Sequence, residues 1–288
     1  MDKNINTILI PVQFDAEHLS VVRQAALLAK EHKAMIHLLA VKSISSIYNF
    51  SYFTQATPVK NTFFHNQEQL AMLETWKRWL EQDYGIKVTP VMELGNWKDV
   101  VLKYAISMNA DLVVLKDKPV QRKWFTFRKS PIEYLIAKCP CQVLTLYSNK
   151  TSMAEWKDIV IPITDFIPEQ RVHTILKLAK VYKFKIHLIA SPINANNSHP
   201  ATFHFFTETL KMLKPSGNIQ VQCEYLDEPG NQVHRFVEYT NRICADALMT
   251  KMKDNRKEKV NSFIKKLENF FNETPYGKYP DTIFPAYH

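Results

Sequence analysis

The sequence predicts an α/β fold of two tandem, doubly wound parallel sheets with five strands each, the second partly degenerate. Three observations lead to it. Short apolar runs alternate with segments of helical periodicity, this order occurs twice, and several residues match between the two copies. Such alternation calls for parallel strands joined by right-handed crossovers, with helices on both faces of the sheet. A chain of 288 residues suffices for two domains of ordinary size.

In the first copy, Ile8–Phe14 is a continuous apolar run, as in a strand buried on both faces. Ala16–His32 carries apolar residues at helical spacing, and Met35–Val41 is a second apolar run. The remaining elements are predicted, in chain order, as a helix at Asn66–Tyr84, a strand at Lys87–Leu94, a helix at Trp97–Met108, a strand at Asp111–Leu115, a helix at Ser130–Cys139 and a strand at Gln142–Tyr147.

The second copy repeats this order. Strands are predicted at Ile159–Thr164, Ile186–Ser191, Gln220–Leu226 and Ala247–Lys251, and helices at Pro168–Tyr182, Ala201–Leu213, Val233–Ile243 and Val260–Phe271. A last strand is expected near Thr282–Tyr287.

An internal duplication supports this division. Matching residues keep their order and spacing: Ile10-Pro11 with Ile161-Pro162, Ala29-Lys30 with Ala179-Lys180, Ile36-His37-Leu38 with Ile186-His187-Leu188, Gly95-Asn96 with Gly230-Asn231, and Lys116 with Lys251. A repeat of this size indicates two similar domains and not a solenoid. We therefore expect domains at residues 1–150 and 151–288, divided in the polar segment Ser148–Ser152.

Composition narrows the functional classes. The formal net charge of +9 favours anionic partners. Five glycines are too few for the Gly-rich loops with which many proteins cradle phosphates. The four cysteines indicate reduced thiols, and Cys139-Pro140-Cys141 lacks the two-residue spacer of common redox and zinc motifs. No signal-like start and no apolar stretch of about 20 residues is present, so we expect a cytoplasmic protein without a membrane span.

Several segments together resemble one known family. They are Ile10-Pro11-Val12, the helix ending in Ala26-Leu27-Leu28-Ala29-Lys30, His37–Val41, Asn109–Leu115 and Cys139–Leu144. In this order they are similar to the universal stress protein family, over the whole first copy and to about Lys251 in the second. The resemblance implies an adenine nucleotide alpha hydrolase-like fold. It also implies a tandem arrangement in which two domains associate as a pseudo-dimer within one chain, and it leaves homodimer formation open.

The resemblance also locates a nucleotide site. In nucleotide-binding members an Asp closes the first strand, and a Gly-x2-Gly-x9-Gly-Ser/Thr loop after the fourth strand holds the phosphates. Here Gln13 stands at the Asp position, and Lys116, Pro119 and Lys129 stand at the glycine positions. Ser130 keeps the hydroxyl. By resemblance, Gln13, Val41, Lys116, Lys129 and Ser130 would line the pocket, with lysine side chains replacing the lost backbone donors.

The second copy departs further from the family pattern. Thr164 stands where the acid would be, and Lys251–Lys259 contains no glycine.

Two other segments of the sequence admit two interpretations each. Lys116–Lys129 interleaves basic and aromatic residues, which suits either an anion site or a solvated face. Ile44–Phe64 is a long aromatic connection, which suits either a partner-binding loop or cover for the sheet.

Motifs for catalysis and metal binding are missing from the sequence. It has no nucleophile elbow, no P-loop, no His-Glu-x-x-His helix, and no histidines at convincing ligand spacing. The first expectation is therefore a non-enzymatic stress-response protein that acts through an unidentified protein partner or anionic ligand, with no cofactor or metal. The alternatives are an ATP- or adenine-nucleotide-binding member with an unconventional lysine-rich loop, and a basic nucleic-acid-binding module, which is the less favoured.

Overall fold

The computed structural model describes residues 5–42, 58–117, 130–147, 150, 153–164, 167–179, 181–190, 199–214, 219–226 and 231–251. These residues all belong to one compact unit, Met1–Lys253. A second unit, Asp254–His288, lies outside the described residues, and so do the predicted helix at Val260–Phe271 and the predicted strand near Thr282–Tyr287. The division into domains 1–150 and 151–288 stays a prediction.

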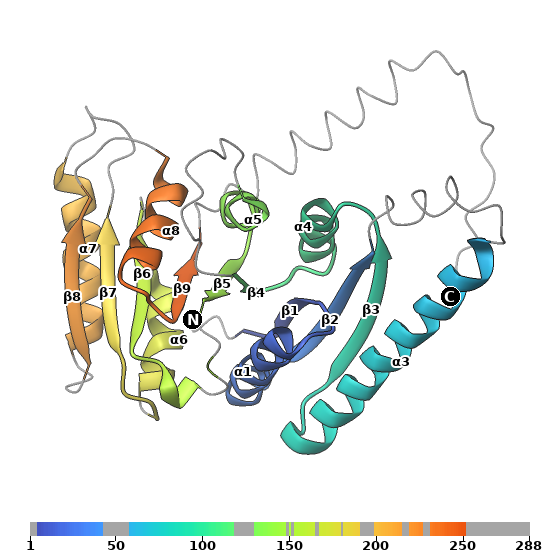
Figure 1. Ribbon diagram of the computed structural model, residues 1–288. Coiled ribbons are helices and arrows are strands. Elements are labelled where there is room, and N and C mark those ends of the chain that lie inside the picture. Colours follow the sequence, from blue (N-terminus) through green and yellow to red (C-terminus); the bar gives the residue numbers. More distant parts are fainter. Residues whose placement is uncertain are drawn as a thin grey trace, which may run out of the picture. The chain divides into compact units, whose positions relative to one another are not determined.

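The predicted order of elements is confirmed in the first copy. Its elements are β1 (Thr7–Val12), α1 (Ala16–His32), β2 (Met35–Lys42), α3 (Pro58–Tyr84), β3 (Val88–Leu94), α4 (Trp97–Ser107), β4 (Leu112–Lys116), α5 (Pro131–Lys138) and β5 (Gln142–Leu146) (Figure 1). The helix α1 has the predicted bounds, because Asp15 caps it by accepting a hydrogen bond from the His18 N–H at 2.7 Å. We refer to β1–β5 with their helices as the first half.

The start of α3 differs from its prediction. The helix begins at Pro58, eight residues before the predicted Asn66. Proline favours the first helical position, where its missing N–H costs no hydrogen bond. Phe63 and Phe64, expected within the aromatic connection, are therefore helical, and residues 43–57 lie outside the described residues.

The second half repeats the pattern within the described residues. A short 3-10 turn at Met153–Glu155 leads into β6 (Asp158–Ile163), α6 (Glu169–Ala179), β7 (Lys185–Ala190), α7 (His199–Leu213), β8 (Gln220–Tyr225), α8 (Gln232–Arg242) and β9 (Ala247–Thr250). The position of each strand and helix predicted between residues 159 and 251 is confirmed, with boundaries shifted by up to three residues.

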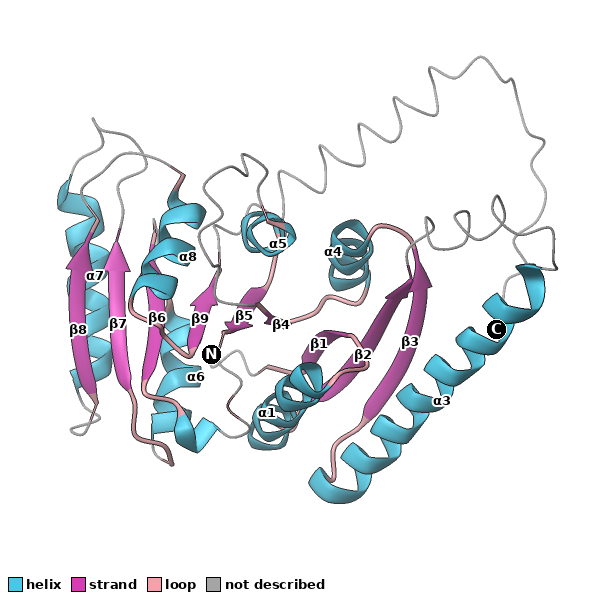
Figure 2. Ribbon diagram, viewed as in Figure 1, coloured by secondary structure: helices cyan, strands magenta, loops and turns pink. Residues whose placement is uncertain are grey.

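The described strands form a single sheet in the order β3-β2-β1-β4-β5-β9-β6-β7-β8 (Figure 2). The order β3-β2-β1-β4 in the first half recurs as β8-β7-β6-β9 in the second, which shows the duplication in the structure. Seven of the eight ladders are parallel, as predicted. The exception is β5–β9, which is antiparallel and joins the two expected sheets into one.

Alternate strand residues enter two apolar cores, one on each face of the sheet. Ile8 and Ile10 of β1 pack on the face covered by α1, α3, α6 and α7, whereas Leu9 packs on the face covered by α4, α5 and α8. This period of two is expected of a strand buried on both sides. The sheet is therefore doubly wound, as the sequence predicts.

Both edges of β9 are occupied in the sheet. One edge pairs with β6, and the other pairs with β5 through Val143–Leu146 and Ala247–Thr250. In the first half the corresponding edge of β4 receives β5 in parallel. The strand β5 therefore fills the place beside β9 that a fifth parallel strand of the second half would take.

Candidate functional site

The first half contains a switch point, where two neighbouring strands continue to helices on opposite faces of the sheet. In the first half this point lies between β1 and β4, because α1 and α5 cover different faces. The β1–β4 ladder contains only Ile8↔Leu112 and Leu9↔Val113, although both strands run on for three more residues. Ligands of open α/β sheets bind outside the carboxyl ends of strands at such a point. By strand order and by its short ladder, the β6–β9 pair takes the equivalent place in the second half, and we refer to it as the switch point of that half.

Four of the five residues predicted for the site lie at this carboxyl edge. Gln13 follows β1 and is exposed, and Val41 is half-buried in β2. Lys116 ends β4, and Ser130 caps α5. The fifth residue, Lys129, lies outside the described residues, as do the aromatic and basic residues at 118–128.

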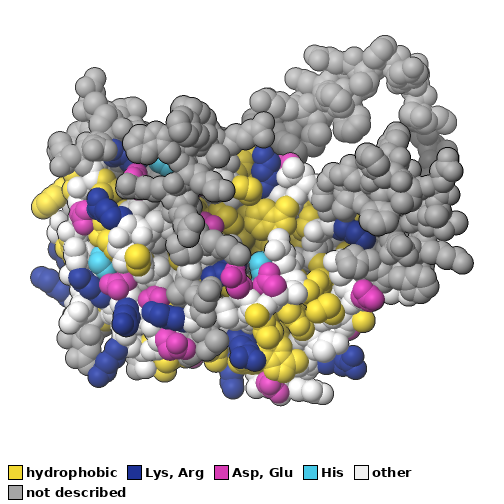
Figure 3. Space-filling view, in the orientation of Figure 1, with side chains coloured by type: hydrophobic (Ala, Val, Ile, Leu, Met, Phe, Trp, Pro, Cys, Tyr) yellow, Lys and Arg dark blue, Asp and Glu magenta, His cyan; other side chains and the backbone are white. Residues whose placement is uncertain are grey.

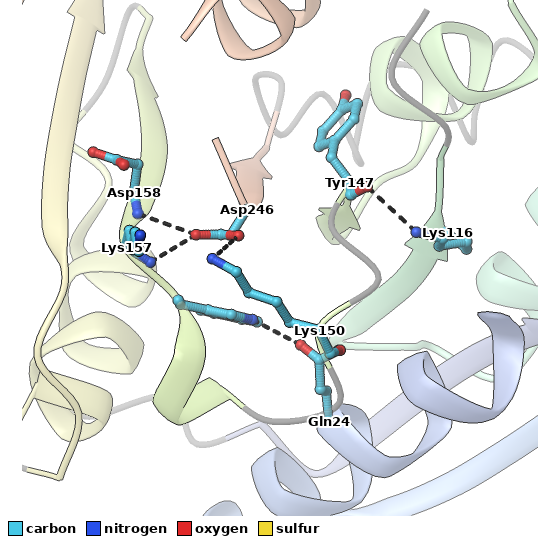
Figure 4. A network of polar contacts seen from close by, with 8 residues as sticks. Gln24, Lys116, Tyr147, Lys150, Lys157, Asp158 and Asp246 are labelled. Atoms are coloured by element: carbon cyan, nitrogen blue, oxygen red, sulfur yellow. Dashed lines mark hydrogen bonds and ion pairs between the residues drawn. The ribbon is translucent and has the colours of Figure 1, made fainter. Parts of the chain in front are cut away.

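The Lys116 side chain is directed toward the neighbouring strand. Its Nζ donates a hydrogen bond to the carbonyl oxygen of Tyr147 at 3.3 Å (Figure 4). The Lys116 ammonium group is therefore a hydrogen-bond donor to the backbone carbonyl of Tyr147, the residue directly after β5.

The amino end of α5, where the family places the phosphates, is capped from within the helix. Ser130 Oγ accepts a hydrogen bond from the Glu133 N–H at 3.1 Å. Pro131, the first residue of the helix, has no N–H to donate. The Glu133 carboxylate then places a negative charge in the first turn, where it is stabilised by the helix dipole. This helix end has few donors left and already holds an anionic group of its own.

Glu133 also connects the two halves. Its Oε1 lies 3.0 Å from Nδ1 of His234 in α8. The Tyr147 hydroxyl is buried nearby, and it has no hydrogen-bond partner among the described residues. Burial, followed by the charges of Asp117 and Glu133, raises the pKa of Tyr147 well above its usual value. Two acidic side chains among the described residues, Asp117 and Glu133, therefore lie near this hydroxyl, and sequence reasoning did not predict them there.

A buried arginine occupies the switch point of the second half. Arg171 in α6 donates from Nη1 to the carbonyl oxygens of Pro162 at 2.9 Å and Met249 at 3.3 Å. These carbonyls belong to β6 and β9, beyond the last pair of their ladder, Val160↔Leu248. The side chain is 1% exposed, and burial lowers the pKa of Arg171 to about 9. The guanidinium thus bridges the two strands where they separate.

Sequence reasoning missed Arg171, although a signal was present. The residue stands at the start of the stripe continued by Ile175 and Leu178, so it lies on the buried face of α6. A charged residue at an apolar stripe position is seldom buried without partners. In the first half, no arginine stands in the corresponding first turns of α1.

A polar network holds the segment that joins the two halves (Figure 4). Gln24 of α1 donates from Nε2 to the Lys150 carbonyl at 2.7 Å, and its Oε1 accepts from the Trp156 indole N–H at 2.8 Å. Asp246 accepts hydrogen bonds from the N–H groups of Lys157 and Asp158 at 2.6 and 3.3 Å. The Lys150 ammonium lies 2.5 Å from the other oxygen of the Asp246 carboxylate.

The described residues on one face of the molecule show no basic patch of the kind that the nucleic-acid alternative would need. On the face shown in Figure 3, basic side chains of the described residues are interspersed with acidic ones and do not form one continuous patch.

Among the residues that the structure describes, no group of three or more His, Cys, Asp or Glu residues is placed to hold a metal ion. The helices that the structure describes include none both long and apolar enough to cross a bilayer.

Comparison with known proteins identifies the first half. Residues 4–146 match the model of the Universal stress protein family. Among curated proteins, none matches this chain.

Solved structures extend the likeness of fold. A universal stress protein from Archaeoglobus fulgidus DSM 4304 is similar over 83% of this chain and 84% of that chain, with 12% identity and a TM-score of 0.51. UspA from Lactobacillus plantarum is 18% identical over 49% of this chain and 97% of that chain, with a TM-score of 0.40. A functionally unknown protein from Pseudomonas aeruginosa PAO1 is 12% identical over 94% of this chain and 98% of that chain, with a TM-score of 0.46. Through the match of its first half, residues 4–146, this chain belongs to the universal stress protein family.

Proposed function

We propose that this chain is a non-enzymatic, cytoplasmic regulatory protein of the stress response that acts without conventional ATP binding. The observation that carries the proposal is the internal cap of α5. Ser130 is bonded to the Glu133 N–H, Pro131 has no donor, and Glu133 adds a negative charge. A triphosphate at this helix end would have to displace the cap and would also meet the Glu133 carboxylate.

The second half supports the same proposal by a different route. A nucleotide at its switch point would have to displace the Arg171 guanidinium from the carbonyls of Pro162 and Met249. Those carbonyls would then lose buried hydrogen bonds, at a cost of about 1–3 kcal/mol each. We therefore propose that neither half binds ATP in the manner of nucleotide-binding members, and that the protein acts through a protein partner or another anionic ligand.

The first experiment asks whether the protein carries nucleotide. Freshly purified protein is denatured, and any released nucleotide is identified by chromatography and mass spectrometry. The stripped protein is then titrated with ATP in a calorimeter and assayed for phosphate release. We expect no nucleotide, no binding heat and no hydrolysis. Stoichiometric nucleotide, or micromolar binding near one site per chain, would overturn the proposal and favour the lysine-rich alternative.

Two single-residue variants locate any binding that is found. Glu133→Gln removes the negative charge from the first turn of α5 and retains the side-chain volume. Lys116→Ala removes the ammonium at the end of β4. If the lysine-rich alternative holds, ATP affinity falls in Lys116→Ala and rises in Glu133→Gln. Under our proposal, both variants bind as little ATP as the unmodified protein.

A further inference from the structure

Two cysteine side chains face one another at the end of α5. The Sγ atoms of Cys139 and Cys141 lie 3.2 Å apart, within the distance of a hydrogen bond between thiols. Residues two apart in a strand point to the same face, where their side chains are too far apart for such a contact. Here the backbone bends at Pro140 and Cys141, and the two sulfurs meet.

Regular structure holds both residues in place. Cys139 caps the carboxyl end of α5, and its N–H donates to the Leu135 carbonyl at 2.8 Å. Cys141 directly precedes β5, whose first residue pairs with Leu112 of β4. The side chains are buried, with Cys139 4% and Cys141 1% exposed, whereas Pro140 between them is half-buried. The pair thus lies just beneath the surface, between two fixed elements.

We propose that Cys139 and Cys141 are a site of reversible oxidation, where a small disulfide such as glutathione disulfide converts the two thiols into an intramolecular disulfide. The thiolate of one cysteine attacks a glutathione sulfur, which forms a mixed disulfide and releases one glutathione thiolate. The second cysteine, as thiolate, attacks the protein sulfur of the mixed disulfide and releases the other. Two protein thiols and one glutathione disulfide thus give one protein disulfide and two glutathione molecules.

The separation of the two Sγ atoms supports formation of the disulfide, and the place of the new bond in the fold predicts its effect on stability. A disulfide places its sulfurs about 2.0 Å apart, so the two Sγ atoms need to approach by only about 1 Å from their present separation. The new bond lies immediately before β5, the strand that pairs with both β4 and β9. A fold that holds the thiols together favours their oxidation. By linkage, the free energy by which folding favours the disulfide equals the free energy by which the disulfide stabilises the folded protein.

The test compares oxidation of the folded and unfolded chain, because any Cys-x-Cys peptide can form some disulfide. Exposed Cys223 and Cys244 are first replaced by serine, which leaves the buried pair alone. The Cys223→Ser/Cys244→Ser protein is equilibrated from both directions in glutathione redox buffers, with and without urea. Alkylation and intact mass then report the fraction that has lost two hydrogen atoms. The controls are Cys139→Ser and Cys141→Ser in the same background, which cannot form the bond.

We expect the equilibrium constant for oxidation to be at least about tenfold larger in the folded protein, a shift of about 30 mV in reduction potential. The oxidised protein should also have a higher melting temperature than the reduced one. An equal or smaller constant in the folded protein would overturn the proposal. So would glutathione adducts or disulfide-linked dimers in place of the intramolecular bond.

Discussion

The imidazole Nδ1 of His187 in β7 lies 3.1 Å from the hydroxyl of Tyr239 in α8. The duplicated pair in the first half, His37 and Tyr104, has the same separation of 3.1 Å, and the ring centroids lie 6.0 Å apart in both pairs. One strand-to-helix contact is thus retained in both halves. The surroundings differ, because Asp158 accepts a hydrogen bond from His187 Nε2 at 2.8 Å, whereas Thr7 stands at the corresponding place in β1.

This asymmetry predicts unequal effects of removing the two hydroxyls. Tyr239→Phe should lower the free energy of unfolding by about 1–2 kcal/mol, since it leaves a deeply buried ring nitrogen without its partner. Tyr104→Phe should cost less than about 1 kcal/mol, because His37 and Tyr104 are half-buried and water can replace the hydroxyl. Urea unfolding of the two variants measures both values. Equal losses would show that the buried and half-buried pairs are energetically equivalent.

Arg171→Ala should destabilise the protein by about 3 kcal/mol, because the carbonyls of Pro162 and Met249 lose a charged donor in a buried site. Arg171→Met should cost less, since its side chain fills part of the same volume. Urea unfolding gives both free energies. A loss below about 0.5 kcal/mol in Arg171→Ala would mean that the guanidinium does not stabilise the separation of β6 and β9.

Asp111 and Asp246 accept hydrogen bonds from backbone N–H groups at the equivalent starts of β1 and β6. We expect the two alanine variants to differ in free energy of unfolding. Asp246→Ala should lower the free energy of unfolding by about 3 kcal/mol, because Asp246 is 3% exposed and also pairs with Lys150. Asp111→Ala, which loses hydrogen bonds from the N–H groups of Asn6 and Thr7, should cost about 1–2 kcal/mol. Asp246→Asn retains an acceptor and should fall between them. Chemical denaturation of the three variants ranks them, and a reversed order would contradict the assignment.

Stability should depend on pH through His32, at the end of α1. The ring is buried, and neither nitrogen has a hydrogen-bond partner among the described residues. Burial lowers the pKa of His32, and the nearby charge of Lys177 lowers it further, against a smaller opposing effect of Glu31. The unfolded chain therefore binds more protons than the folded one below about pH 6.5, so stability falls as the pH drops from this value toward the folded pKa.

The test is the difference in unfolding free energy between pH 7.5 and pH 5.5, values chosen to bracket about 6.5, the ordinary histidine pKa. His32→Leu should reduce this difference, because the variant has no side chain at this position that can bind a proton. An identical pH dependence in His32→Leu and the unmodified protein would refute the assignment to His32.

The local sequence pattern was sufficient to predict the helices and strands of this fold, but not the pairing of strands that joins the two halves into one sheet. The apolar runs and helical stripes place the described strands and helices, and Asp15 and Ser130 mark helix starts by their side-chain chemistry. The pairing of β5 with β9 joins residues about a hundred positions apart, and no periodicity encodes which edge a strand will meet. The prediction of two separate sheets therefore lacked the one antiparallel ladder.

In the candidate site, too, the positions of residues along the chain were predictable, whereas their contacts with residues distant in sequence were not. Resemblance placed Gln13, Lys116 and Ser130 at the carboxyl edge of the sheet, because motif order follows strand order. The partners of these residues were not predictable. That Ser130 bonds to Glu133, and that Tyr147 is buried beside acidic groups, depends on the packing of α5 against strand and helix neighbours that are distant in sequence.

The sharing of β5 bears on how this polypeptide could be divided. A fragment ending after Tyr147 would leave one side of β5 unpaired, and a fragment beginning near Trp156 would leave β9 open in the same way. Unpaired sheet edges attract other strands, so each fragment produced alone should self-associate. Produced together, the two fragments have complementary edges and should reassemble into a one-to-one complex, which makes this junction a natural place for a split version of the protein.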